Sequence, residues 1–172
     1  MNSKSFGAAS SSSYASTYPR EDLRHRLTPL QYQVTQEKGT ERAFSGKLNK
    51  CKDEGIYSCI VCGEDIFSSD TKYDSGSGWP AFYDVLHQGK IKVKPDTSHV
   101  GGNILLLAMK PGLARTAVSC AQCGAHLGHL FEDGPRPTGK RFCINSAALS
   151  FISTKEIDGS ISATHWIGKP QF

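Results

Sequence analysis

The chain has 172 residues, a mass of 18.7 kDa and a formal net charge of +4 at pH 7. Its length favours one domain, and 38% hydrophobic with 21% charged residues describe a globular chain rather than a disordered or collagen-like one. Charges of both signs are interspersed, which gives nucleic-acid binding little support, and the longest apolar run, residues 104–109, is far too short to span a bilayer.

The first 20 residues hold seven serines and no acidic residue. So few large apolar groups cannot offset the entropy of ordering, and residues 1–18 are predicted to form a disordered tail. The tail loosely resembles an organelle transit peptide, which makes mitochondria the alternative to the cytoplasmic location that we expect. A single domain over residues 19–152 and a C-terminal extension over 153–172 complete the predicted organisation.

Two short helices are predicted at the start of the domain. Leu23 and Leu27 recur four residues apart, as on one face of a helix. Thr28 and Gln31 have the spacing of a capping box, with a proline at the first helical position and Gly39 as the stop signal.

Beyond Gly39, short apolar or alternating runs are divided by Gly, Pro, Asp and Asn. Such runs predict strands, at residues 56–61, 91–93, 104–109, 116–119, 141–151 and 161–166. The predicted fold is therefore mainly β, with antiparallel sheets and short N-terminal helices.

Four of the six cysteines form two Cys-x-x-Cys pairs, Cys59 with Cys62 and Cys120 with Cys123, each followed by glycine. No secretory segment precedes them, so we expect a reducing compartment, where such pairs more often hold metal than form disulfides. Four thiolates make a closed tetrahedral site, which predicts one structural Zn²⁺ that staples two distant parts of the domain. The alternatives are a disulfide framework and a redox-active pair, and the latter calls for a βαβ context that the sequence does not show.

Cys143 belongs to neither pair and lies in an alternating run. Period-two alternation places it on one face with Arg141 and Asn145, while Phe142 and the residue after Cys143 face the core. The cations before it, including Arg141 and Lys140, are expected to lower the thiol pKa from about 8.5 and make a nucleophile. A buried, inert cysteine is the alternative.

His126 and His129 directly follow the second cysteine pair. Their spacing fits proton donors near the thiolate, ligands of a second metal with Cys143, or simply hydrogen-bonded histidines, and leaves the three open. Trp79 follows a loop of small residues, where its indole faces a ligand or packs in the core.

Four motifs together resemble the methionine-R-sulfoxide reductases of the B type, from about residue 27 to residue 151. They are Gly-Ser-Gly-Trp-Pro at 76–80, Cys-Gly-Ala-His-Leu-Gly-His at 123–129, Asp-Gly-Pro at 133–135 and Arg-Phe-Cys-Ile-Asn-Ser at 141–146. The resemblance implies a β-rich domain with a structural zinc. It also implies an oxidoreductase that repairs oxidised proteins by reducing the R epimer of methionine sulfoxide, free or in proteins.

The same resemblance implies roles for individual residues. It makes Cys143 the nucleophile, and the implied pocket consists of Trp79, His99, His129 and Asn145. Supporting substrate-binding positions are His126 and Asp133. In the implied reaction Cys143 attacks the sulfoxide sulfur while His129 protonates its oxygen, so that methionine leaves and Cys143 becomes a sulfenic acid.

Ser77 stands where many members of that family have a resolving cysteine. Either Cys51, the cysteine left over, resolves the sulfenic acid, or an external thiol attacks it directly. The resemblance implies thioredoxin as the reductant. A surface thiol is the alternative for Cys51, and a monomer is expected.

Two other classes of protein are the alternatives to this enzyme. A zinc-knuckle interaction module would leave Cys143 structural and make Trp79 part of a binding surface. A zinc hydrolase or deaminase needs an open metal position, which a four-cysteine site lacks.

Overall fold

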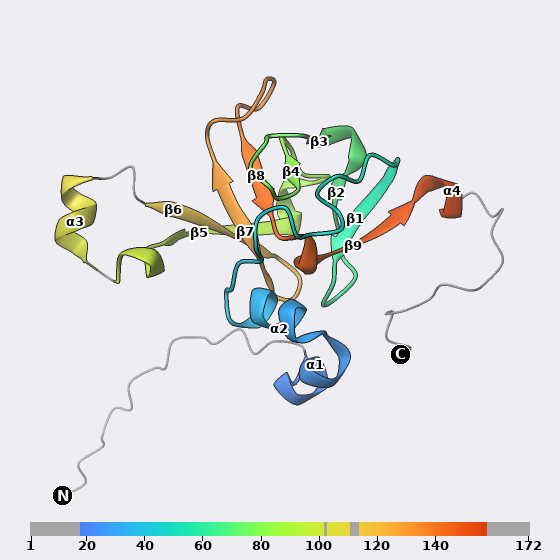
Figure 1. Cartoon of the computed structure of the whole chain (residues 1–172), viewed down its shortest axis with the longest axis horizontal. Coiled ribbons are helices and arrows are strands. Elements are labelled where there is room, and N and C mark those ends of the chain that lie inside the picture. The colour runs from blue at the N-terminus through green and yellow to red at the C-terminus, as the bar shows by residue number, and fades with distance from the viewer. Residues whose placement is uncertain (1–17, 102, 111–113, 158–172) are drawn as a thin grey trace, which may run out of the picture.

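The computed structural model describes residues 18–101, 103–110 and 114–157, and Figure 1 shows their arrangement. The predicted N-terminal tail, apart from Tyr18, lies outside these residues. The predicted strand at 161–166 and most of the predicted C-terminal extension lie outside them too.

Two helices open the domain, α1 (Arg20–Arg26) and α2 (Pro29–Gln36). The predicted capping box is confirmed at α2. The Thr28 hydroxyl accepts a hydrogen bond from the backbone N–H of Gln31 (3.2 Å), and the Gln31 side chain accepts one from the N–H of Thr28 (2.9 Å). These reciprocal bonds satisfy two N–H groups that the first turn of a helix otherwise leaves unpaired.

The end of α2 lies where it was predicted, with a different residue in the strained position. The Gly39 N–H donates to the Gln33 carbonyl (2.9 Å), but Lys38 is the residue with the left-handed φ of 56°. Gly39 thus closes the helix without using its own conformational freedom.

Two antiparallel sheets form the body of the domain, as predicted. The smaller has the order β2–β1–β9 and the larger the order β3–β4–β8–β7–β6–β5. The strands of the smaller sheet are β1 (Gly55–Cys59), β2 (Asp65–Ser68) and β9 (Leu149–Ser153). Those of the larger sheet are β3 (Lys72–Tyr73), β4 (Ala81–Phe82), β5 (Ile91–Asp96), β6 (Arg115–Cys120), β7 (His126–Phe131) and β8 (Arg141–Ile144). Two further short helices are α3 (Ile104–Met109) and α4 (Thr154–Ile157).

The hydrophobic core lies where the two sheets meet, and aromatic rings from both fill it. Phe67 of β2 stacks on Phe82 of β4, with ring centroids 4.3 Å apart, and Tyr57 of β1 meets the same Phe82 at 5.1 Å. All three side chains are fully buried. Burial of such rings stabilises the packing of the sheets by far more than any single polar contact.

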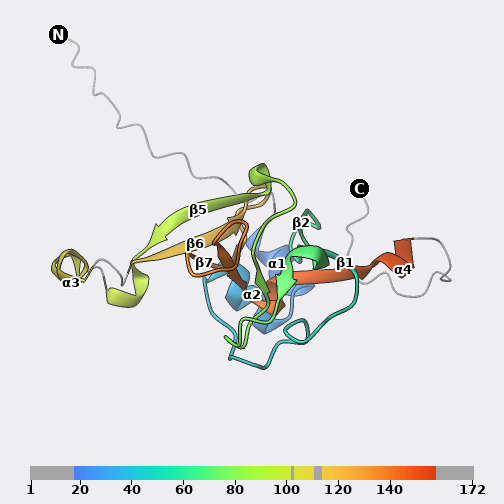
Figure 2. The ribbon, with the colours of Figure 1, turned by 90° about the horizontal axis from the view of Figure 1, so that it is seen from above.

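The strand predicted at residues 104–109 is wrong, because the structure forms helix α3 there. The Asn103 side chain caps this helix by accepting a hydrogen bond from the N–H of Leu106 (3.0 Å). A short apolar run does not distinguish a strand from a helix, and leucine, alanine and methionine favour the helix. The helix lies at the tip of the β5–β6 hairpin, which extends away from the body in both views (Figure 1; Figure 2).

The single strand predicted over residues 141–151 is in fact two strands in different sheets. β8 ends at Ile144, and the chain then crosses to the smaller sheet through a 3-10 turn, Ser146–Ala148, before β9 begins. Asn145 and Ser146, two short polar residues, mark the crossing. Such side chains favour turns because they bond to nearby backbone.

The sequence prediction missed β2, β3, β4 and β7. Two of these strands have only two residues, too few for a period to show. β7 contains Gly128, a residue that weakens strand propensity. The structure explains this glycine, because a Cβ atom there would lie 2.1 Å from the carbonyl oxygen of Cys143. None of the helices among the described residues is long and apolar enough to cross a membrane.

Candidate functional site: a thiol–imidazole pair beside a four-cysteine centre

The two Cys-x-x-Cys pairs form knuckles of the same design. The Gly63 N–H donates to the carbonyl of Cys59 (2.8 Å), and the Gly124 N–H donates to that of Cys120 (2.9 Å). Both glycines have left-handed backbone, with φ of 77° and 76°. The glycine after each pair is therefore required by the turn, as the sequence suggested.

The four sulfur atoms converge on one point, within 4.8 Å of one another. The Sγ atoms of Cys59 and Cys123 are 3.7 Å apart, and those of Cys62 and Cys120 are 3.6 Å apart. A tetrahedron with metal–sulfur bonds of about 2.3 Å has edges of about 3.8 Å, so the spacing fits a four-coordinate ion. One knuckle follows β1 of the smaller sheet and the other follows β6 of the larger. The cysteines thus form a metal site of the structural kind that joins the two sheets.

Cys143 lies at the centre of the larger sheet. The strand register places it opposite Ala81 of β4 on one side and opposite His129 of β7 on the other. Phe142 and Ile144 are buried while Cys143 is partly exposed, which confirms the predicted alternation within β8. Side chains directly opposite on one face of an antiparallel pair have Cβ atoms about 5 Å apart. The structure therefore brings the thiol and the imidazole of His129 together.

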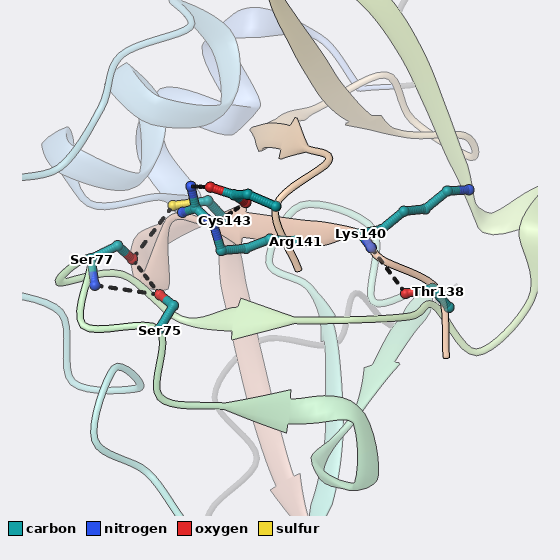
Figure 3. Close-up of polar contacts among 7 residues, drawn as sticks. Ser75, Ser77, Thr138, Lys140, Arg141 and Cys143 are labelled. Atoms are coloured by element: carbon teal, nitrogen blue, oxygen red, sulfur yellow. Dashed lines mark hydrogen bonds and ion pairs between the residues drawn. The ribbon is translucent and has the colours of Figure 1, made fainter. Parts of the chain in front are cut away.

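A serine pair lies next to the thiol. Cys143 Sγ is 3.9 Å from the hydroxyl oxygen of Ser77, which is 2.8 Å from that of Ser75 (Figure 3). A hydroxyl at this position is able to donate to a thiolate and so favours the charged form. Ser77, noted from the sequence only as the absence of a cysteine, is a direct neighbour of the reactive sulfur.

The predicted lowering of the thiol pKa is wrong for this structure. Burial raises the pKa of Cys143 above its ordinary value, although the Ser77 hydroxyl and the Arg141 charge act in the opposite direction. The side chain of Lys140 points away from the sulfur (Figure 3). Arg141 is held in a bidentate ion pair by Asp133, at 2.8 and 2.9 Å. The resting thiol therefore keeps its proton at neutral pH.

His129 has a carboxylate partner that the sequence did not reveal. Its Nε2 lies 2.8 Å from Oδ2 of Asp96, at the end of β5, and both side chains are mostly buried. The other oxygen of Asp96 accepts hydrogen bonds from the backbone N–H and the hydroxyl of Ser98. The Ser98 bonds, together with His129, hold the pKa of Asp96 well below its usual range. A carboxylate only accepts, so Nε2 of His129 carries the hydrogen.

His126 is buried against His129, with ring centroids 5.4 Å apart in an edge-to-face arrangement. Burial lowers its pKa to about 4, and the nearby His129 adds to this effect, so the ring is neutral at pH 7. Among the described residues, the four cysteines are the one group of three or more metal-ligating side chains that converge. A second metal held by these histidines with Cys143 therefore has no geometric support.

Trp79 and Asn145 are linked through one buried residue, Glu41. The indole N–H of Trp79 donates to the Glu41 carbonyl (3.0 Å), and the Asn145 side chain accepts from the Glu41 N–H (3.0 Å). Asn145 also donates to the carbonyl of Leu127 in β7 (3.0 Å). It lies past the end of β8 and is buried, so the prediction that it shares the exposed face of Cys143 is wrong.

No contact between His99 and the thiol is found among the described residues. His99 lies exposed in a 3-10 turn, Ser98–Val100, and its ring makes no hydrogen bond to the rest of the described chain. Asp96, three residues earlier, is the group from this stretch that reaches His129.

Cys51 lies before β1 and, like Cys143, is a free thiol in the structure. Its carbonyl accepts a hydrogen bond from the ammonium group of Lys72 in β3 (2.8 Å), and β4 lies between β3 and β8. With strands about 4.8 Å apart, β3 is about 10 Å from β8. A disulfide needs Cα atoms about 4.4–6.8 Å apart, and no strand pairing among the described residues brings Cys51 that close to Cys143.

Two neighbouring cavities share part of their lining. One of about 570 Å³ is lined by Ser75, Ser77, Asp133 and Arg141, among others, and Ser77 contacts the Cys143 sulfur. The second, of about 430 Å³, includes Cys51 in its lining, and Tyr73 and Asp74 border both. The first cavity therefore borders Ser77 and Arg141, two neighbours of Cys143.

Sequence reasoning missed Asp96 and Glu41. Asp96 precedes Ser98 by two residues, a pattern that signals a turn and says nothing of a histidine partner. Glu41 lies in a polar segment, and its partners are as far as 106 residues away in the chain. No local pattern encodes contacts of that range.

Residues 27–153 match the family model described as the SelR domain. The chain belongs to the SelR family. Related proteins in this family include "Methionine-R-sulfoxide reductase B1" of Drosophila melanogaster, 61% identical over 137 residues, which are 80% of this chain and 66% of that protein. "Methionine-R-sulfoxide reductase B3, mitochondrial" of Mus musculus is 55% identical over 145 residues, covering 83% of this chain and 53% of the relative. "Peptide methionine sulfoxide reductase MsrB" of Methanosarcina barkeri is 49% identical over 136 residues, covering 79% and 87%.

This membership confirms the resemblance read from the four motifs. The matched SelR residues contain both knuckles, Cys143, His129 and Asp96. The chain spans about two thirds of the fruit-fly relative and about half of the mouse relative.

Proposed function

We propose that this SelR-family chain reduces the R epimer of methionine sulfoxide in peptides and proteins, with Cys143 as the nucleophile. The observation that supports this most directly is the register of β7 and β8. It sets Cys143 directly opposite His129, so that a thiol and an imidazole share one face of the larger sheet, and Ser77, which contacts the Cys143 sulfur, lines a neighbouring cavity of about 570 Å³.

In the proposed reaction the Cys143 sulfur attacks the sulfoxide sulfur, and the oxygen passes to Cys143. The thiol loses two electrons and becomes a sulfenic acid, while the sulfoxide gains them and leaves as methionine. His129 gives a proton to the sulfoxide oxygen and regains one from the thiol, so protons balance. A protonated resting thiol suits this cycle, because thiolate formation is coupled to the arrival of the substrate.

The neighbours have proposed roles in this step. Asp96 fixes Nε2 of His129, which leaves Nδ1 as the nitrogen that transfers the proton. Ser77 supports the thiolate by its hydroxyl. The indole of Trp79 offers an apolar wall for the sulfoxide methyl, and the Arg141–Asp133 pair borders the cavity.

Regeneration requires a second thiol. An attacking thiol displaces water from the Cys143 sulfenic acid and forms a disulfide, which a further thiol then reduces. We propose Cys51 as this resolving thiol, after movement of its segment, with thioredoxin as the final reductant; direct attack by an external thiol is the alternative.

We propose zinc as the ion of the four-cysteine site, because four thiolates in a tetrahedral arrangement suit its preference. When bound, zinc supplies folding free energy and no reaction step, since the cysteines occupy every coordination position. The knuckle residues Cys59, Cys62, Cys120 and Cys123 would hold it.

Further parts of the proposal concern the whole chain. The catalytic unit is the single domain over residues 19–152, acting as a monomer in the repair of oxidised proteins. We propose a cytoplasmic location, with mitochondria as the alternative that the name of the mouse relative favours.

The test is turnover of each resolved epimer of a methionine-sulfoxide peptide, driven by dithiothreitol, for the wild type and for Cys143→Ser. We expect R-epimer reduction by the wild type, none by the variant, and little reduction of the S epimer. Absence of turnover by folded, zinc-loaded wild type would overturn the enzyme proposal in favour of an interaction module.

A further inference from the structure

Glu41 is a buried carboxylate that the proposed reaction does not use. It lies in the irregular segment between α2 and β1 and is only 3% exposed. No cation pairs with it among the described residues. A charged group in this position needs hydrogen bonds to offset its lost hydration, and the structure supplies them from the backbone.

Both carboxylate oxygens cap the turn that follows Cys143. Oε1 accepts from the N–H of Ser146 (2.6 Å), and Oε2 accepts from the N–H of Ala147 (2.9 Å). These N–H groups begin the 3-10 turn Ser146–Ala148, so they would otherwise be buried without partners. The carboxylate therefore fixes the backbone where the chain leaves β8.

The backbone of Glu41 holds two side chains of the proposed site. Its N–H donates to Asn145, and its carbonyl accepts from the indole N–H of Trp79. One residue thus connects three segments that are distant in sequence: its own, the loop carrying Trp79, and the turn after Cys143. Gly46 packs against Glu41 and Ser146, since a Cβ atom at residue 46 would lie 2.3 Å from Ser146 Cβ and 2.8 Å from Glu41 Oε1.

We propose that Glu41 is a positioning residue for the sulfoxide site: by capping the 146–148 turn it holds Trp79 and Asn145 in place around Cys143. This inference rests on the proposed function for its kinetic consequence. Glu41 touches no reacting atom, so its effect passes entirely through the residues that it holds.

The first test compares Glu41→Gln and Glu41→Ala with the wild type. Glutamine keeps the volume but turns one oxygen into a donor that faces an N–H, while alanine removes both acceptors. We expect kcat/KM to fall at least 10-fold in Glu41→Gln and further in Glu41→Ala. Part of this fall should come from a rise in KM, because Trp79 shifts. The matched control is Glu37→Gln, the same change at an exposed carboxylate, which should leave both constants within 2-fold.

A second variant displaces the carboxylate without removing its charge. Gly46→Ala places a methyl group against Glu41 and Ser146, and we expect the same kinetic defect. Gly89→Ala is its control, since a Cβ there meets nothing within 4 Å. If Glu41→Ala fails to fold, Gly46→Ala and Glu41→Gln decide the question.

A fluorescence readout separates positioning from general stability and needs no turnover. In a Trp166→Phe background Trp79 is the single tryptophan, and we expect its acrylamide quenching constant to rise at least 2-fold in Glu41→Gln. A purely structural Glu41 would lower the melting temperature alone. Unchanged quenching together with unchanged kcat and KM in the folded variants would overturn the proposal. Raised quenching in a protein whose wild type reduces no sulfoxide would reject the proposed function and keep the positioning role.

Discussion

Asp96 and His129 meet across an intervening strand. Their side chains are 2.8 Å apart, although β6 runs between β5 and β7. In the register, Asp96 pairs with Arg115 and His129 pairs with Ala117, two residues further along β6. Arg115 and Ala117 are the β6 residues that share this face, and the side chain directly opposite His129 is only the methyl group of Ala117.

The carboxylate of Asp96 should be required for rapid turnover. In Asp96→Asn the amide presents a donor or an acceptor to His129 and no longer dictates which ring nitrogen carries the hydrogen. General acid catalysis contributes about 10²–10⁴-fold to rates, so we expect kcat to fall at least about 10-fold. Steady-state kinetics with the R epimer measure it, with Asp22→Asn on exposed α1 as the control. A variant with wild-type kcat would exclude Asp96 from the mechanism.

The size of residue 117 offers a separate test of the same geometry. Ala117→Leu fills the space over β6 and keeps both Asp96 and His129. We expect a loss of kcat similar to that in Asp96→Asn, and little further loss when the two substitutions are combined, because both break one contact. Ala114→Leu, at an exposed position, is the size control. Additive losses would show that the leucine acts in some other way.

Loss of the metal should uncouple the two sheets. Cys62→Ser removes one of four ligands, and we expect a free energy of unfolding lower by at least about 3 kcal/mol, since metal-site binding energy is folding energy. Metal analysis should find one zinc per wild-type chain and far less in the variant. Cys51→Ser, which leaves the knuckles intact, should retain both the metal and the stability.

The buried, neutral His126 should make the stability of the folded chain sensitive to acid. Its pKa of about 4 in the folded chain lies below the ordinary 6.5. The unfolded chain therefore binds the proton first, and stability falls as the pH drops from about 6.5 to about 4. The shift corresponds to about 3 kcal/mol at its full extent.

The groups that act on His126 in the folded chain are His129, Asp96 and Lys38. Urea unfolding at pH 7 and pH 5 should show a smaller acid loss in His126→Gln than in the wild type. His25→Gln, at an exposed histidine, should keep the wild-type loss. Equal losses in all three proteins would contradict the buried neutral state.

The route of recycling is open to direct detection. If Cys51 resolves the sulfenic acid, enzyme oxidised by substrate without reductant should yield a peptide that links Cys51 to Cys143 in mass spectrometry. Because both cysteines are free thiols in the structure, they must first come together, and we expect this link to form more slowly than methionine is released. A persistent sulfenic acid with no linked peptide would assign the step to an external thiol.

Local patterns in the sequence predicted local features. The capping box at Thr28, the two knuckles and the alternation within β8 all depend on residues within a few positions of one another, and the structure confirms each, although the alternation stops before Asn145. The helix at 104–109 was missed because six apolar residues are compatible with either period.

The relations that organise the site could not be predicted in this way. Asp96 finds His129 through the pairing of three strands, and Glu41 finds Ser146 at a separation of 105 residues. The prediction of a lowered thiol pKa was wrong for the same reason. The sequence places Arg141 near Cys143 but shows neither the ion pair of Arg141 with Asp133 nor the burial of Cys143.

The crossing at Asn145 has a consequence for the order in which the protein matures. Cys143 acquires its neighbours from two strands made before it, β4 and β7, and the turn that follows it is capped by Glu41, near the start of the domain. During synthesis the thiol therefore emerges as an ordinary cysteine. It becomes a specialised one when nearly the whole domain has left the ribosome and the two sheets have docked.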